Sequence, residues 1–276
     1  MTYEEMFREI NSDFRDVSMH CTQKVIPVIG KIARKSSRYP VKHVYGWKHP
    51  QSHNVYFYFA IVKKHSLWDK PEVITFCEVQ RKEGKEIIVL DFEKDIYTLR
   101  DTLIIKVLQP HFLKRYAERY LEYEDDEVKE SRLIIFLYRN LYSISLGEKL
   151  ASDKELQKID SEQSNEAILH FDGLCLAKRS KEIRNIIIYK TFIPVYQLYP
   201  EQYAYVMQEY LQLFNTAACR DYPQCTATIQ QITNEGREKT HKILYEEHSL
   251  TPEKKLKAYA EEYEHTIKKL CEYIIL

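Results

Sequence analysis

The chain has 276 residues, of which 44% are hydrophobic and 30% charged, and its 41 basic residues balance its 41 acidic residues. This composition is typical of a globular protein and excludes a disordered chain, which needs low hydrophobicity and high net charge. A neutral chain has no global field that would draw it to nucleic acid or an anionic membrane, although a local basic face is compatible with neutrality. No run of about 18 apolar residues predicts a transmembrane helix, and the acidic N-terminus lacks a signal-peptide core. We therefore expect a cytoplasmic protein that does not contact a membrane.

The glycines and cysteines exclude several familiar sites. The six glycines are too widely spaced for GxGxxG, GxxxxGK or GxSxG, which disfavours a dinucleotide site, a P-loop and a nucleophile elbow. The six cysteines form no CxxC pair, so they read as reduced, mostly buried thiols. His49 and His53 have a spacing seen in metal sites, but no further ligands accompany them. We expect neither a metal nor a cofactor.

The first half of the chain predicts one long helix followed by a sheet. Apolar residues recur at steps of three and four over residues 3–36, with Pro27 placed to kink or divide the helix. A region rich in Ser, Pro and His follows at 35–53 and is typical of a loop. Apolar and alternating runs then predict four strands in an antiparallel meander, at residues 54–63, 72–80, 86–91 and 102–108.

The second half predicts two helices, two strands and a helical end. Pro110 is well placed in the first turn of a helix that continues over 111–122, and another helix is expected over 127–142. Residues 147–165 are polar and predict a loop, and strands are expected at 167–171 and 183–193. From Pro200 onward three amphipathic helices are expected, the last beginning at Thr251 and Pro252. The sequence therefore predicts an α+β fold with its sheet over 54–193. It predicts a 1–198 domain and a helical region over 199–276 that either packs on this domain or forms a subdomain.

The most distinctive pattern is His111, Arg115 and Arg119, spaced by four residues on the predicted helix after Pro110. This spacing places all three side chains on one helix face. An imidazole and two guanidinium groups on one face would hold a phosphodiester, with His111 as acid or base and the arginines neutralising developing charge. The alternative is a solvated face with i,i+4 pairs, from which the aromatic side chains point inward. Its charged residues would be Lys114, Arg115, Glu118 and Arg119, and its inward aromatic residues Phe112, Tyr116 and Tyr120.

The stretch from Tyr97 to Pro194 resembles small bacterial and phage domains linked to the barnase/RelE-like toxin ribonuclease group. The residues that carry the resemblance are the strand before Pro110, the His-x3-Arg-x3-Arg helix, and the final segment DGLCLAKRSKEIRNIIIYKTFIP. The resemblance implies a nuclease-like fold that binds RNA. It adds Lys190 and Thr191, on the last predicted strand, to the candidate site of His111, Arg115 and Arg119.

The densest basic patch of the sequence lies between two predicted strands. It consists of Lys178, Arg179, Lys181 and Arg184. These residues either contact a phosphate backbone or form a solvated turn. We count Arg179 and Arg184, together with Lys190 and Thr191, as candidate substrate-binding residues.

Acidic residues and one thiol offer weaker possibilities. Asp91, Glu93 and Asp95 alternate at a strand end, which is typical of an exposed turn and less often of a divalent-ion site. Cys175 lacks an identifiable basic partner other than His170, which indicates a buried structural thiol in preference to a nucleophile.

Two functional interpretations remain. The first is a non-enzymatic binding or interaction protein, because no complete catalytic set can be assembled. Its partner surface would be the C-terminal helices or the sheet, since the 22 tyrosines suit half-buried interfaces. The second is an RNA-binding or ribonuclease-like domain centred on the helix face of His111.

Overall fold

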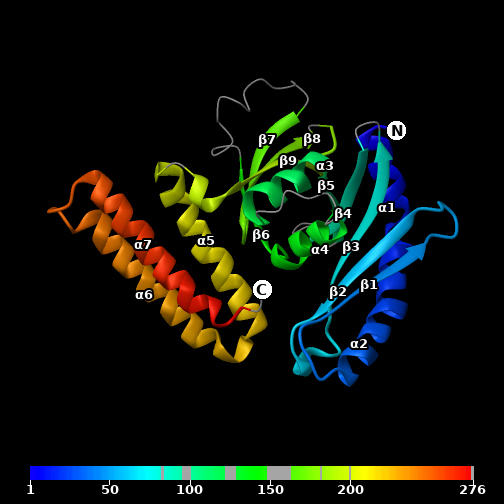
Figure 1. Cartoon of the computed structure of the whole chain (residues 1–276), viewed down its shortest axis with the longest axis horizontal. Coiled ribbons are helices and arrows are strands. Elements are labelled where there is room, and N and C mark those ends of the chain that lie inside the picture. The colour runs from blue at the N-terminus through cyan, green and yellow to red at the C-terminus, as the bar shows by residue number, and fades with distance from the viewer. Residues whose placement is uncertain are drawn as a thin grey trace.

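A computed structural model describes residues 1–81, 84–94, 101–121, 129–147, 163–180, 182–198 and 200–274 of the chain. The expected α+β class is confirmed, because in these described residues helices cover a mostly antiparallel sheet of nine strands (Figure 1). The strands are β1 (Val41–Lys48), β2 (Val55–Val62), β3 (Glu72–Arg81), β4 (Gly84–Lys94), β5 (Asp101–Leu108), β6 (Ser143–Gly147), β7 (Gln163–His170), β8 (Gly173–Ser180) and β9 (Ile186–Pro194).

The strand order is β1-β2-β3-β4-β5-β9-β8-β7-β6, so the sheet consists of two antiparallel meanders joined at one parallel pair. The expected antiparallel meander over β2 to β5 is confirmed. The joint is β5 beside β9, where Leu108 is in register with Tyr189 and Lys106 with Ile187. Because parallel neighbours need a crossover connection, the helices after β5 and strands β6 to β8 intervene before the chain returns as β9.

The predicted helix over residues 3–36 is confirmed as α1 (Tyr3–His20), a π-helical turn (Cys21–Val25) and α2 (Ile26–Lys35). Pro27 stands in the first turn of α2, where its missing N–H costs little. The apolar stripe of these helices is buried against one face of β2 to β5 and β9, through residues such as Met6 and Ile29.

Two shorter helices cover the other face of the sheet. They are α3 (Pro110–Tyr116), which continues as a π-helical segment (Ala117–Leu121), and α4 (Lys129–Arg139). Buried Asp172 accepts hydrogen bonds from Tyr116 Oη (2.6 Å), Arg139 Nε (2.9 Å) and Asn140 Nδ2 (3.0 Å). This carboxylate therefore fixes α3, α4 and the β7–β8 turn to one another.

The C-terminal helices are α5 (Pro200–Asp221), α6 (Thr226–Tyr245) and α7 (Pro252–Cys271). Thr251 is the N-cap residue of α7, as expected, but its hydroxyl makes no capping hydrogen bond. The three helices pack together, and α5 lies nearest the sheet (Figure 1). Their common core includes residues of β6, β7 and β8, among them Leu146, Leu169 and Leu174.

Two expectations about secondary structure were wrong. Residues 41–48, expected as part of a loop, form the edge strand β1, in which one side of the alternating VKHVYGWK pattern packs under α1 and α2. Residues 173–180 form the strand β8, although the sequence predicted only a turn followed by a basic patch there. Most of the expected loop at 147–165 lies outside the described residues, and β7 begins within it at Gln163.

Candidate functional site

The His111 helix face lies on α3, and its side chains pair mainly with one another. Arg115 Nε lies 3.4 Å from His111 Nε2, and Arg115 Nη1 lies 3.2 Å from Glu118 Oε2. Lys114 also approaches Glu118, at 3.7 Å. His111 is exposed and Arg115 is half-buried. This pattern contains the i,i+3 and i,i+4 pairs of a solvated helix face, with an imidazole held beside a guanidinium at its start.

The structure places α3 beside β9, but Arg119 and Lys190 both have internal partners. Arg119 Nη1 donates to the Phe192 carbonyl at 2.7 Å, which ties the end of the helix to the strand. Lys190 Nζ donates at 3.1 Å to Gln109 Oε1, in the residue before α3. Thr191 is half-buried and in register with Leu176 of β8. The candidate residues therefore lie on the neighbouring elements α3 and β9, which Arg119 and Lys190 link to each other.

Of the other basic candidates, Arg184 is exposed and Arg179 is paired. Arg179 forms a bidentate ion pair with Glu166, in which Nε donates at 2.7 Å and Nη2 at 2.9 Å. Its Nη1 also donates to the Arg184 carbonyl at 2.8 Å. Arg179 consequently neutralises a buried carboxylate inside the sheet, and the pKa of Glu166 is lowered: burial alone would raise it, but the hydrogen bonds from Arg179 and Ser145 prevail.

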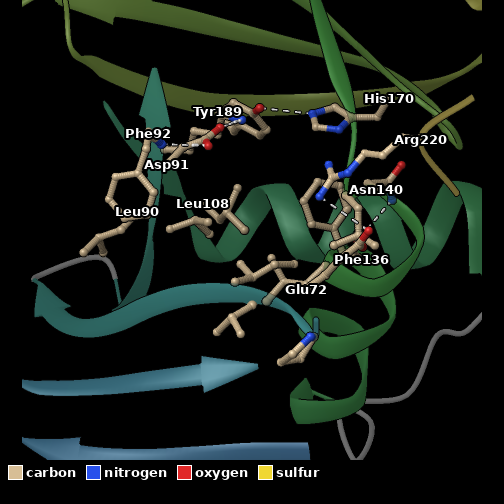
Figure 2. A pocket seen from close by; sticks show the side chains of 17 residues that line it. Glu72, Leu90, Asp91, Phe92, Leu108, Phe136, Asn140, His170, Tyr189 and Arg220 are labelled. Atoms are coloured by element: carbon tan, nitrogen blue, oxygen red, sulfur yellow. Dashed lines mark hydrogen bonds and ion pairs between the residues drawn. The ribbon is translucent and has the colours of Figure 1, made fainter. Parts of the chain in front are cut away.

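A different concave site lies between α4 and the sheet, with a volume of about 340 Å³. It is lined from β3, β4, β5, β9, the end of β7, α4 and the end of α5. Figure 2 shows its side chains, with Asp91, Tyr189 and His170 along one side, Leu108 and Phe136 in the middle, and Glu72 at the other end. We call this site the α4 pocket.

The first charged pair of the α4 pocket is Asp91 with Lys106. Asp91 is in register with Ile104 across β4 and β5, so Lys106, two residues further along, projects from the same face. Lys106 Nζ lies 2.6 Å from Asp91 Oδ2 and 3.4 Å from Ser143 Oγ. Burial would raise the pKa of Asp91, but the charge and hydrogen bond of Lys106, together with the backbone N–H of Phe92, outweigh burial and the pKa is lowered.

The second charged pair is Glu72 with Arg220, which comes from the last turn of α5. Arg220 Nη2 lies 3.5 Å from Glu72 Oε1. Behind Glu72 lies buried Lys63, 3.8 Å from Glu72 Oε2 and 2.6 Å from Asp221 Oδ2. The Tyr142 hydroxyl lies within hydrogen-bonding distance of both Glu72 and Asp221. This network holds the end of α5 against the first half of the sheet.

His170 and Tyr189 supply the neutral polar groups of the pocket. His170 Nε2 and Tyr189 Oη are 3.0 Å apart. Burial and then the charge of Lys106 lower the pKa of His170 to about 3, so its ring is neutral near pH 7. Burial raises the pKa of Tyr189 well above its usual value. Both groups therefore act as neutral hydrogen-bonding partners and not as charges.

The remaining polar clusters have structural explanations. The His49 ring accepts hydrogen bonds at Nδ1 from the backbone of Gln51 and Ser52, beside a buried Asp13 at 3.6 Å. Cys175 is fully buried, and burial raises its pKa, as expected of a structural thiol. Within the described ranges, no group of three or more His, Cys, Asp or Glu side chains is arranged to hold a metal ion.

The α4 pocket was not predicted from the sequence, although the sequence contains two signals of it. Lys106 interrupts the apolar run TLIIKVL, and a charge on a buried strand calls for a partner. Asp91 was noted, but as part of an acidic turn. It is instead the partner of Lys106, while the Glu93 side chain and Asp95 lie outside the described part of the chain. His170 and Arg220 carry no local signal.

No described helix has the length and apolarity that a bilayer crossing requires. Comparisons of the chain with protein-family models, with curated proteins and with solved structures find no match.

Proposed function

We propose that the protein is a non-enzymatic binding protein that holds a small organic ligand in the α4 pocket. The observation that carries this proposal is the convergence of two ion pairs and a neutral His–Tyr pair on one concave site. Ligand sites are typically concave, mostly apolar, and provided with a few converging polar groups. Ionisable side chains whose pKa values are displaced by burial and by named charges also favour functional sites.

The walls and the size of the pocket fit this role. Leu108, Phe136 and Leu137 are buried and give the pocket an apolar floor. A volume of about 340 Å³ falls at the lower end of the roughly 300–1,000 Å³ that small-molecule sites occupy. The pocket therefore suits a compact metabolite or a single side chain of a partner better than a dinucleotide.

The chemistry of the pocket favours binding over catalysis. His170, with a pKa of about 3, is a weak base near neutrality. Lys106 Nζ is engaged in the 2.6 Å ion pair with Asp91, which suits it to donating hydrogen bonds. The buried thiol of Cys175 is not among the lining residues.

A pocket-filling substitution tests this proposal. Ile74 lines the pocket from β3 and is only partly buried, so Ile74→Trp has room to extend into the pocket. Val55→Trp is the matched control, because Val55 is an exposed strand residue away from the pocket. Charged and neutral organic fragments are screened by ligand-observed NMR. We expect fragments that bind the wild type and Val55→Trp but not Ile74→Trp. Equal binding to all three proteins, or no binding, would contradict the proposal.

RNA binding is a second candidate function, supported by the contact of His111 with Arg115 on a helix that lies beside β9. An exposed imidazole 3.4 Å from a guanidinium is compatible with holding and cleaving a phosphodiester. The test is RNA cleavage by the wild type and by His111→Ala, with His241→Ala as the exposed control. Cleavage that is lost only in His111→Ala supports this candidate. Equal or absent cleavage in all three removes it.

A further inference from the structure

The guanidinium of Arg220 has unused hydrogen-bonding capacity at the rim of the α4 pocket. Its side chain is 60% exposed. Its contacts within the described residues are the 3.5 Å ion pair with Glu72 and a position over the Tyr142 ring at 5.3 Å from the ring centre. Neither contact is a hydrogen bond, whereas a guanidinium carries five N–H donors in a planar fork. That fork matches the two oxygens of a carboxylate or phosphate.

Lys106 offers a second donor to the same pocket. Its ammonium has three N–H groups, and its contacts in the described part of the chain are Asp91 Oδ2 and Ser143 Oγ. The contact to Asp91 is short, at 2.6 Å, and the contact to Ser143 is long, at 3.4 Å. One N–H of Lys106 is therefore unassigned, and the Ser143 contact is weak enough to be exchanged.

The acidic side chains of the pocket already have several ionic and hydrogen-bonding partners. Glu72 faces Lys63, Arg220 and the Tyr142 hydroxyl. Asp91 accepts from Lys106 and, through Oδ1, from the backbone N–H of Phe92 at 2.8 Å. A cationic ligand would have to replace one of these existing partners. Among the four charged side chains of the pocket, donors are thus in excess and acceptors are not.

We propose that the ligand of the α4 pocket is a small organic anion, a carboxylate or phosphate monoester on an apolar body. Its anionic group is held by the Arg220 fork with help from Lys106, and its apolar body packs on Leu108 and Phe136. This inference rests on the proposed function. The pocket volume of about 340 Å³ corresponds to roughly ten water-sized groups, which is the scale of a substituted benzene ring.

The probes are chosen to separate charge from shape. Benzoate and phenyl phosphate present the two anionic groups on one apolar body, benzyl alcohol is a neutral analogue, and inorganic phosphate is an anion without the body. Binding is measured by titration calorimetry. The expected order places benzoate or phenyl phosphate first, with the tighter of the two identifying the anionic group. Benzyl alcohol and inorganic phosphate are expected to bind at least about tenfold more weakly. Benzyl alcohol lacks the anionic group, and inorganic phosphate lacks the apolar body.

Three substitutions test how the pocket holds the anion. Arg220→Gln is expected to weaken the organic anions about tenfold or more and to leave benzyl alcohol unchanged. Arg8→Gln is the matched control, since Arg8 is 69% exposed with one long ion pair of 4.0 Å. Asp91→Asn removes the carboxylate that competes for Lys106 and is expected to strengthen anion binding.

The outcomes separate the two proposals. Benzyl alcohol binding as tightly as the anions, or anion binding that Arg220→Gln leaves unchanged, overturns the anion assignment while the pocket stands as a ligand site. If the four probes and all organic fragments behave alike towards the wild type and Ile74→Trp, both the proposed function and the anion assignment fail.

Discussion

Lys63 and Asp221 form a buried ion pair, with Lys63 Nζ 2.6 Å from Asp221 Oδ2 and both side chains less than 5% exposed. Lys63 follows β2, and Asp221 ends α5, so the pair joins the first half of the sheet to the C-terminal helices. Lys64 reinforces the junction, since its Nζ donates to the Asp221 carbonyl at 2.8 Å and lies over the Tyr222 ring. Because Arg220 is the adjacent residue, this junction also sets one wall of the α4 pocket.

Removing one partner of this buried pair is expected to be costly. Lys63→Met leaves the buried Asp221 carboxylate without its 2.6 Å cationic partner, and Asp221→Leu leaves Lys63 with only the longer 3.8 Å contact to Glu72. Each single variant should lower the free energy of unfolding by about 3 kcal/mol. The double variant should lose less than the sum of the two single losses, because no isolated charge remains. Urea denaturation measures all four proteins. Strictly additive losses would show that the two groups do not interact.

His170 is expected to make stability pH-dependent in mildly acidic solution. Its folded-state pKa of about 3 is below the ordinary 6.5, so below pH 6.5 the unfolded chain takes up a proton that the folded protein excludes. The contribution of His170 to the free energy of unfolding is therefore complete above pH 6.5 and is lost as the pH falls toward 3. Between pH 7 and pH 4 it amounts to about 3 kcal/mol.

Comparison of two histidine variants isolates this effect. Denaturation at pH 7, 5.5 and 4 should show a smaller acid loss in His170→Gln than in the wild type. His241→Gln should behave like the wild type, because His241 is 65% exposed. Parallel curves for His170→Gln and the wild type would contradict a buried neutral His170.

Gly236 allows α6 and α7 to approach closely. A Cβ at this position would lie 2.4 Å from Thr266 Oγ1 and 2.7 Å from its Cγ2. Alanine favours a helix over glycine by about 1 kcal/mol, but relieving this overlap requires the helices to move apart, at a typical cost of about 1–3 kcal/mol. We expect Gly236→Ala to lower the melting temperature, and Thr266→Ala to reduce that loss when combined with it. A rise in melting temperature for Gly236→Ala would indicate looser packing.

The hydrogen bond from Tyr116 to Asp172 is expected to contribute measurably to the position of α3. Tyr116→Phe removes a 2.6 Å bond to a buried carboxylate and should lower the free energy of unfolding by about 2 kcal/mol. Tyr45→Phe is the matched control, since the Tyr45 hydroxyl makes no hydrogen bond within the described residues. Equal stability of the two variants would show that Asp172 does not depend on Tyr116.

Local patterns in the sequence predicted the helices and most of the strands. The stripe that includes Met6 and Ile10 identified α1, and Pro252 after Thr251 identified α7, because both signals lie within a few residues. β1 was missed since Pro40, Gly46 and Pro50 favour a loop, and its alternation has physical meaning only once α1 and α2 cover one side. The parallel pairing of β5 with β9 joins segments about 80 residues apart, which no local pattern predicts.

The α4 pocket illustrates the same limit. Asp91 and Lys106 lie on neighbouring strands, so their contact follows from the β4–β5 pairing. His170 and Arg220 reach the pocket only through the packing of β7 and α5, and a single sequence does not encode that arrangement in any spacing. The His111 helix face was predictable because it lies on one helix, but its position beside β9 was not.

The most direct test of the central claim is to map where a bound fragment lies. Two-dimensional amide NMR of the full chain, titrated with a fragment that binds, should show its largest shifts in residues 72–74, 89–92, 106, 108 and 189, which line the α4 pocket. Val55→Trp should give the same map, and Ile74→Trp should abolish it. Shifts confined to α3 and to Lys190, with residues 72–74 and 106–108 unmoved, would contradict the account.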